Sequence, residues 1–176
     1  YGLYGVANVI TGETSPSGHL VDTYAYSNFS SPASQNYGDF SFSNYDHTYV
    51  VYQEGIYVGY KYYETRYEDA VMGQGNAVSA AGAVNSEGDW NYQQEIVYPF
   101  GYGLSYTEFT QKITDVSWDT ENRTVTVTVD VKNIGDYDGK SVVELYAQTP
   151  YTEYDKENKV EKASVQLVGY GKTQTL

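Results

Sequence analysis

Carboxylates are the side chains in this sequence best suited to acid–base or nucleophilic chemistry. A retaining glycosidase, for example, needs two carboxyl groups about 5–5.5 Å apart across the bond that it breaks. The candidates are Asp46, Glu54, Glu64, Glu68, Asp69 and Glu95. Because sequence gives no spatial separation, each acid alone is better explained as a surface or hydrogen-bonded structural residue. Glu54 stands out because it precedes Gly55 in a β-prone aromatic run, where it either contacts substrate or accepts structural hydrogen bonds.

The other reactive residue types lack the partners that their chemistry requires. The chain has no cysteine, which excludes disulfides, thiol nucleophiles and CxxC metal sites. His19 and His47 have no second histidine or cysteine close in sequence, so no zinc site is predicted. The stretch Asp136-Tyr137-Asp138-Gly139 resembles part of a calcium loop but lacks the glutamate that would complete it. We therefore expect no metal site and no cofactor.

Two glycine-containing stretches resemble catalytic motifs without matching them. Gly103-Leu104-Ser105-Tyr106 lacks the final glycine of a nucleophile elbow. Residues 135–141 have three residues between the glycines where a phosphate-binding loop has four, and their two aspartates would repel phosphate. We predict a hairpin turn there. Neither serine hydrolysis nor nucleotide binding is supported.

The charge and composition of the chain restrict its partners. Ten basic and 23 acidic residues give a formal charge of −13, so nucleic acid is not an expected partner. No apolar run approaches the roughly 20 residues of a membrane helix, and residues 1–12 lack the basic segment of a signal peptide. Secretion and a bacterial cytoplasmic location both remain open. The 22 tyrosines against 5 phenylalanines suit pleated strands, and amphipathic rings also suit a carbohydrate surface.

The first 25 residues are expected to contain one helix and one short strand. Apolar residues within 3–10 recur at helical spacing, and Gly12 follows where a left-handed C-cap belongs. A turn is predicted at residues 15–18 and a strand at residues 20–24. Since the helical pattern is already running at Tyr1, we expect the helix to be cut at its front.

The middle of the chain is less regular. Residues 25–44 are rich in serine, asparagine and aromatics and predict a long ordered loop. Residues 49–52 and 55–63 are β-prone, the second run with glycines where a backbone approaches closely. Residues 72–88 are weakly patterned and predict a surface insertion.

From Phe109 onward the pattern changes to strict alternation. Valines at positions 125, 127, 129 and 131 face one way and polar residues the other, which is typical of a half-buried strand. Turn residues at 133–139, strands at 141–147 and 164–168 and a charged loop at 153–162 indicate an antiparallel sandwich. An immunoglobulin-like sandwich needs about seven strands and roughly 100 residues. We therefore expect a partial sandwich in a chain truncated at both ends.

Three blocks in order resemble the C-terminal half of family 3 glycoside hydrolases, the β-glucosidases. They are residues 5–20, residues 52–64 (YQEGIYVGYKYYE) and residues 98–107 (YPFGYGLSYT). Ser15, His19 and Val21 depart from the commoner residues of the first block. Residues 131–135, 139–146 and 167–172 resemble the fibronectin type III-like domain of many members. The resemblance covers nearly the whole chain.

The resemblance implies a mixed α/β and all-β fold in two domains. Residues 1–108 would be the C-terminal portion of an α/β sandwich domain. Residues 109–176 would be a partial immunoglobulin/fibronectin III-like antiparallel β-sandwich.

The resemblance also implies a retaining exo-acting enzyme that removes terminal β-D-glucosyl residues from β-glucosides or oligosaccharides. The family's nucleophile is an aspartate of a (β/α)-barrel that is missing here, and its acid/base is a glutamate that precedes the first helix of this chain. No catalytic residue is therefore assigned, Glu54 is the one substrate-binding candidate, and the isolated chain is expected to be inactive.

Two alternatives remain open. A free-standing carbohydrate-binding or adhesion module would use surface tyrosines as stacking platforms, but it should have complete edge strands. A structural accessory role without sugar contact is favoured for residues 109–176.

Overall fold

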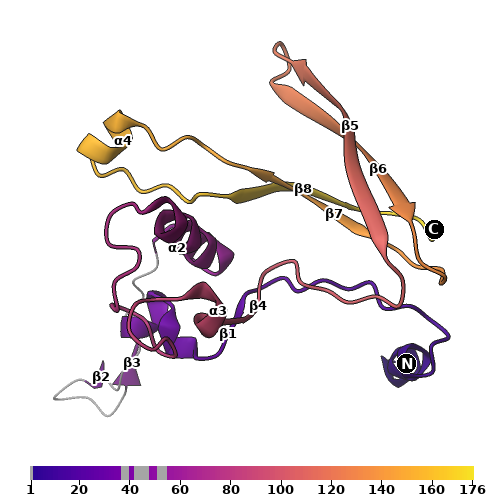
Figure 1. Cartoon of the computed structure of the whole chain (residues 1–176), viewed down its shortest axis with the longest axis horizontal. Helices are drawn as coiled ribbons and strands as arrows, with labels where there is room; N and C mark the ends of the chain where they lie inside the picture. The colour runs from indigo at the N-terminus through magenta and orange to yellow at the C-terminus, as the bar shows by residue number, and fades with distance from the viewer. Residues whose placement is uncertain (1, 37–39, 42–47, 51–54) are drawn as a thin grey trace. The chain divides into compact units, whose positions relative to one another are not determined.

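A computed structural model describes residues 2–36, 40–41, 48–50 and 55–176 (Figure 1). The helices are α1 (Gly2–Ile10), η1 (Asn28–Ser30), η2 (Ala33–Asn36), α2 (Tyr60–Met72), α3 (Tyr92–Glu95) and α4 (Glu153–Glu157), of which η1 and η2 are 3-10 helices. The strands are β1 (Tyr24–Ala25), β2 (Phe40–Ser41), β3 (Thr48–Tyr49), β4 (Ile96–Tyr98), β5 (Phe109–Asp119), β6 (Thr124–Asn133), β7 (Val142–Ala147) and β8 (Gln166–Lys172). Within the described residues they form four two-stranded sheets, β1–β4, β2–β3, β5–β6 and β7–β8. The predicted mixed α/β character of the fold is confirmed by this combination of helices and strands.

The chain divides into two compact units, each assembled from separate segments. Unit 1 comprises residues 1–19, 103–145 and 168–176, and unit 2 comprises residues 20–102 and 146–167. These units are defined by spatial contacts. The predicted domain boundary at residue 109 follows sequence texture and stays a prediction.

The predicted first helix is confirmed as α1. Gly12 has φ +78° and its N–H donates to the carbonyl of Val9 (3.1 Å), so it adopts the left-handed conformation that glycine permits beyond a helix end. Thr14 N donates to Asn8 O (3.1 Å), which reverses the chain at residues 11–14. The turn predicted at residues 15–18 is therefore wrong. The turn lies at residues 11–14, and residues 15–18 have no regular structure.

Strands β5 and β6 form the long antiparallel hairpin of unit 1 (Figure 1). Phe109 pairs with Asn133 at one end and Trp118 with Val125 near the other. An irregularity between Ile113 and Asp115 shifts the register by one residue, which returns the apolar residues of β5 to one face. The predicted alternation holds in the second half of β6, where the valines at 127, 129 and 131 are half-buried and their neighbours exposed.

The hairpin turn predicted at residues 135–141 is wrong. This segment leaves β6, which pairs with β5, and enters β7, which pairs with β8. It bends because backbone amides in it and just before it donate hydrogen bonds to distant carbonyls. Ile134 N donates to Glu108 O (2.8 Å), and Gly139 N donates to Leu176 O (3.1 Å). A Cβ on Gly139 would lie 2.8 Å from Thr107 Cγ2, so only glycine fits there without a shift. The aspartates between the glycines stay exposed.

Unit 2 has a small core formed by Tyr63, Trp90 and Ile96. Tyr24 of β1 pairs with Tyr98 of β4, so only the end of the predicted strand at residues 20–24 is extended and paired. Tyr63 comes from α2, where β structure was expected at residues 55–63. That expectation is wrong, since residues 55–59, all of them described, form no strand and α2 begins at Tyr60.

The expected charged loop at residues 153–162 begins with the short helix α4. The side chain of Thr152 accepts a hydrogen bond from Asp155 N, and the Asp155 carboxylate accepts one from Thr152 N, which is a capping box. The strand predicted at residues 141–147 is confirmed as β7. The strand predicted at residues 164–168 begins two residues later and runs longer, as β8.

Candidate functional site

Helix α2 organises unit 2 and carries the side chains of the candidate site. Tyr60, Tyr63, Tyr67 and Val71 recur at helical spacing, and Tyr63 is buried against Trp90 and Ile96. Packing of Tyr63 in this core overrides the β propensity of the individual tyrosines. Glycines bound the helix, with Gly59 as N-cap (φ 55°) and Gly73 as a left-handed C-cap (φ 69°).

Arg66 of α2 fastens the following loop to the helix. Its Nε donates to Ala77 O (2.9 Å) and its terminal nitrogens donate to Ser79 O (2.7 Å) and Tyr62 Oη (2.7 Å). The guanidinium carbon also lies 4.7 Å from the ring centroid of Trp90, a cation–π contact. The planar guanidinium is thus committed to the protein itself, and the predicted surface insertion is irregular but fixed.

Glu95 is fully buried, with 0% exposure, and holds the same loop at a second point. One carboxylate oxygen accepts hydrogen bonds from Val84 N (2.9 Å), Asn85 N (3.0 Å), and both the N (2.9 Å) and the Oγ (2.8 Å) of Ser86. Burial by itself raises the pKa of Glu95, but these hydrogen bonds outweigh burial and bring the pKa below its usual value. Glu95 therefore stays ionised and structural.

Tyrosine hydroxyls lock further contacts around α2. Tyr92 donates to the Glu64 carboxylate (2.5 Å), and Tyr63 Oη and Ser30 Oγ lie 2.8 Å apart in a buried hydrogen bond. Burial, followed by the neighbouring Glu64 carboxylate, raises the pKa of Tyr92 far above its ordinary value. Glu64 is thus held by a neutral donor inside the protein.

The segment between β7 and β8 is attached to α2 and the residues before it. Ser164 N donates to Thr65 Oγ1 (2.8 Å), Leu167 N to Tyr60 Oη (3.0 Å) and Lys162 N to Tyr57 Oη (3.2 Å). Tyr57 Oη also donates to Lys162 O (3.3 Å). Three side-chain hydroxyls therefore accept hydrogen bonds from backbone amides between Lys162 and Leu167, the last of which lies in β8.

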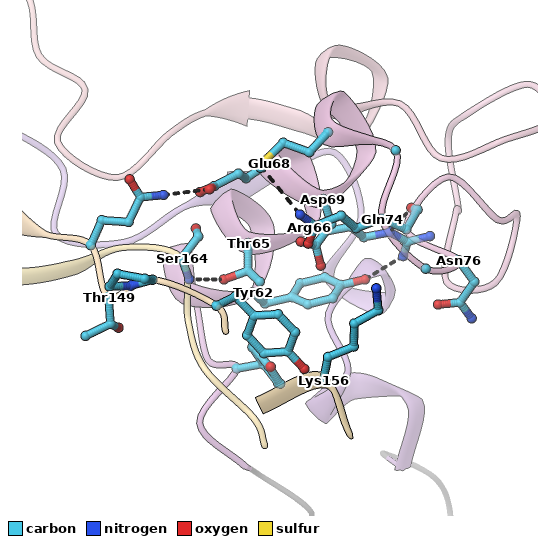
Figure 2. Close-up of a pocket in the computed structure, with 18 of the residues that line it drawn as sticks. Tyr62, Thr65, Arg66, Glu68, Asp69, Gln74, Asn76, Thr149, Lys156 and Ser164 are labelled. Atoms are coloured by element: carbon cyan, nitrogen blue, oxygen red, sulfur yellow. Dashed lines mark hydrogen bonds between the residues drawn. The ribbon is translucent and has the colours of Figure 1, made fainter. Parts of the chain in front are cut away.

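A pocket of about 1040 Å³ lies between α2, the loop after it and residues 148–156 (Figure 2). Figure 2 shows Tyr62, Arg66, Glu68 and Asp69 of the helix, with Thr149 and further side chains of the later segment. Glu68 accepts a hydrogen bond from Gln148 Nε2 (2.6 Å), which ties the two walls together. Burial, and then the nearby Glu68 carboxylate, raises the pKa of Asp69. The pocket therefore combines tyrosine rings with polar groups.

The predicted carboxylates have different fates. Glu54 and Asp46 lie outside the described residues, as does His47. Glu64 and Glu95 are bound by other side chains or backbone, while Glu68 and Asp69 line the pocket. No group of three or more histidine, aspartate and glutamate side chains placed to hold a metal occurs in the described part of the chain.

Sequence reasoning missed Arg66. A usable signal existed in part, because Arg66 stands four residues after Tyr62 and therefore on the same face once the segment is read as a helix. The carbonyls that Arg66 binds come from an irregular loop, and no pattern identifies them. Among the described residues, none of the helices is both long and apolar enough to cross a membrane.

Comparison with known proteins gives a consistent result. No protein-family model matches the chain. It is 36% identical over 98% of its length to a β-glucosidase of Ruminococcus albus, spanning 14% of that protein. It is 30% identical over 95% of its length to thermostable β-glucosidase B of Acetivibrio thermocellus, spanning 17% of it.

Solved structures agree with these relatives. A β-glucosidase from Paenibacillus barengoltzii matches 97% of this chain at a TM-score of 0.68 and 29% identity, over 15% of its own length. β-Glucosidase 3B from Thermotoga neapolitana, in complex with α-D-glucose, matches 97% at a TM-score of 0.64 and 30% identity, over 19% of its length. The shared fold identifies the chain as part of a glycoside hydrolase. Within that class it belongs to the family 3 β-glucosidases, as the three sequence blocks predicted, and it spans less than a fifth of the relatives named here.

Proposed function

We propose that this chain serves as a segment of a retaining β-glucosidase that hydrolyses terminal non-reducing β-D-glucosyl residues. The observation that carries the proposal is the 36% identity to the Ruminococcus albus β-glucosidase along 98% of the chain. In such an enzyme one carboxylate attacks the anomeric carbon and a second carboxyl group first donates and then accepts a proton. Both groups would be supplied by parts of the enzyme outside this chain, as would the (β/α)-barrel.

We also propose that the isolated chain does not catalyse hydrolysis. Two described carboxylates that were candidates for chemistry are held by the protein: Glu64 by Tyr92 and Glu95 by backbone amides of the loop. Because the pKa of Glu95 lies below its ordinary value, this residue has no proton to donate near neutral pH. The role assigned to this chain is to hold the loops and sheet edges that support a neighbouring active site.

The finer fold assignment belongs to the same proposal. Residues 1–108 would be the end of the α/β sandwich domain and residues 109–176 part of a fibronectin III-like domain. The β5–β6 hairpin, the β7–β8 pair and the alternation in β6 support the second assignment. The alternative of a free-standing carbohydrate-binding or structural module is less well supported, because the similarity to β-glucosidases runs along nearly the entire chain.

Two assays test the proposal. The purified chain should release p-nitrophenol from p-nitrophenyl β-glucoside no faster than a buffer blank. A chimera in which it replaces the matching segment of the Ruminococcus albus enzyme should hydrolyse the same substrate. Clear turnover by the isolated chain, abolished by Glu54→Gln, would place a catalytic group within it. A folded chimera without activity would count against the enzyme role.

A further inference from the structure

The pocket beside α2 has polar groups that the protein itself does not use. Within the described part of the chain, the side chains of Asp69, Asn76 and Lys156 form no hydrogen bond or ion pair, although all three line the pocket. Asp69 is half-buried, so an unpaired carboxylate there gains from a hydrogen-bond donor. The pocket thus presents the Asp69 carboxylate as a hydrogen-bond acceptor, the Asn76 amide as both donor and acceptor, and the Lys156 ammonium as a donor.

The same pocket has three tyrosine rings, from Tyr57, Tyr62 and Tyr151. Two of these rings are fixed at their far ends, since Tyr57 Oη bonds to the backbone of Lys162 and Tyr62 Oη accepts from Arg66. The third ring, that of Tyr151, is 50% exposed and has no such anchoring hydrogen bond among the described residues. Rings held in place before a ligand arrives reduce the entropy cost of binding.

The charge around the pocket decides which ligand class fits. The guanidinium of Arg66 already donates hydrogen bonds to Tyr62 and to two backbone carbonyls, so few of its N–H groups remain to bind an anion. Glu68, Asp69 and Glu153 also line the pocket, and the chain has a net charge of −13, which disfavours anions further. A cation would meet the free ammonium of Lys156. A neutral molecule with many hydroxyls can use the free carboxylate, amide and ammonium at once.

We propose that this pocket binds a neutral saccharide, with tyrosine rings against its C–H faces and with Asp69, Asn76 and Lys156 hydrogen-bonded to its hydroxyls. The volume of about 1040 Å³ accommodates more than one sugar ring. The proposal requires no hydrolysis by this chain and stands apart from the proposed function. A pocket that binds sugar without cleaving it would satisfy this inference while leaving the enzyme role undecided.

The test is a titration of the isotope-labelled 176-residue chain with cellobiose, followed by amide chemical shifts. We expect saturable shifts concentrated in the second half of α2, the loop after it and residues 148–156, at millimolar affinity. Tyr151→Ala should weaken binding about fivefold or more through loss of a ring face, and Asp69→Asn about tenfold or more through loss of a charged acceptor. Asn76→Ala, at an exposed loop position, provides a third variant that leaves α2 intact.

The matched control is Tyr154→Ala, which removes a tyrosine that is 69% exposed and does not line the pocket. It should bind cellobiose as the original chain does. Absence of saturable shifts, shifts that Tyr151→Ala and Tyr154→Ala reduce equally, or binding of spermidine in place of cellobiose would each overturn the proposal.

Discussion

Replacement of Glu95 by glutamine should destabilise unit 2 without changing its shape. The substitution keeps the size of the side chain but removes its charge, and four hydrogen bonds converge on one oxygen of that carboxylate. A hydrogen bond to a charged group contributes about 1.5–3 kcal/mol, against about 1 kcal/mol for a neutral one. The new amide would also bury a donor where the second Glu95 oxygen has no partner among the described groups. Because such contributions are not additive, we expect a loss of about 2–4 kcal/mol in the free energy of unfolding.

Thermal unfolding followed by circular dichroism measures this loss. For a chain of this size, about 2–4 kcal/mol corresponds to a fall of roughly 4–16 °C in the melting temperature. The matched control is Glu87→Gln, which alters an exposed glutamate on the same loop and should stay within about 0.5 kcal/mol of the original chain. If Glu95→Gln and Glu87→Gln melted at the same temperature, the argument that the carboxylate organises the loop would be wrong.

The same residue predicts an acid limb of stability. The pKa of Glu95 in the folded chain lies below its ordinary value, so the carboxylate stabilises the fold fully at pH above the unfolded pKa of about 4.3. This contribution diminishes as the pH falls toward the folded pKa. Glu95→Gln should flatten the corresponding part of the curve of stability against pH, and an unchanged curve would show that another group dominates.

Three further predictions concern other parts of unit 2. Arg66→Lys keeps the charge but loses the planar fork that reaches two loop carbonyls, so urea unfolding should show a loss of about 1–3 kcal/mol; an unchanged midpoint would contradict this. The hydrogen bond from Lys162, aided by Thr152, lowers the pKa of Asp155 to about 2, so helix α4 should be secure above about pH 3.9 and fray as the pH falls through about 2. Amide shifts of α4 should follow that titration, and Asp155→Asn should abolish it. Gly73→Ala meets open space but requires φ 69°, so it should cost about 1 kcal/mol in thermal unfolding, and no cost would refute the role of the left-handed cap.

Local patterns predicted the elements whose signal lies in consecutive residues. Helix α1 with Gly12 at its end and the alternating valines of β6 follow directly from spacing. Tyr60 shows where that reasoning fails, because tyrosine favours strands in isolation whereas packing of Tyr63 in the core selects a helix. Helix α4 was missed although Thr152 and Asp155 form a capping box with the correct spacing.

The candidate site was less predictable than the fold because long-range contacts create it. Arg66 and Glu95 are ordinary charged residues in sequence, and only the folded loop brings carbonyls to one and amides to the other. The path of residues 135–141 likewise depends on Thr107 and Leu176, which lie far away in sequence. A pocket formed by a helix and a segment some 80 residues later has no local signature.

The hydroxyls of Tyr57 and Tyr60 accept hydrogen bonds from backbone amides just before and at the start of β8, which bears on how this sequence tolerates mutational drift. Exchange of tyrosine for phenylalanine is usually among the mildest substitutions, since it removes a single oxygen. At these two positions it would leave the amide of Lys162 or Leu167 without its acceptor. At Tyr154 or Tyr170, both strongly exposed, the same exchange has no such cost. The excess of tyrosine over phenylalanine thus reflects, in part, positions where the hydroxyl accepts a hydrogen bond from a backbone amide.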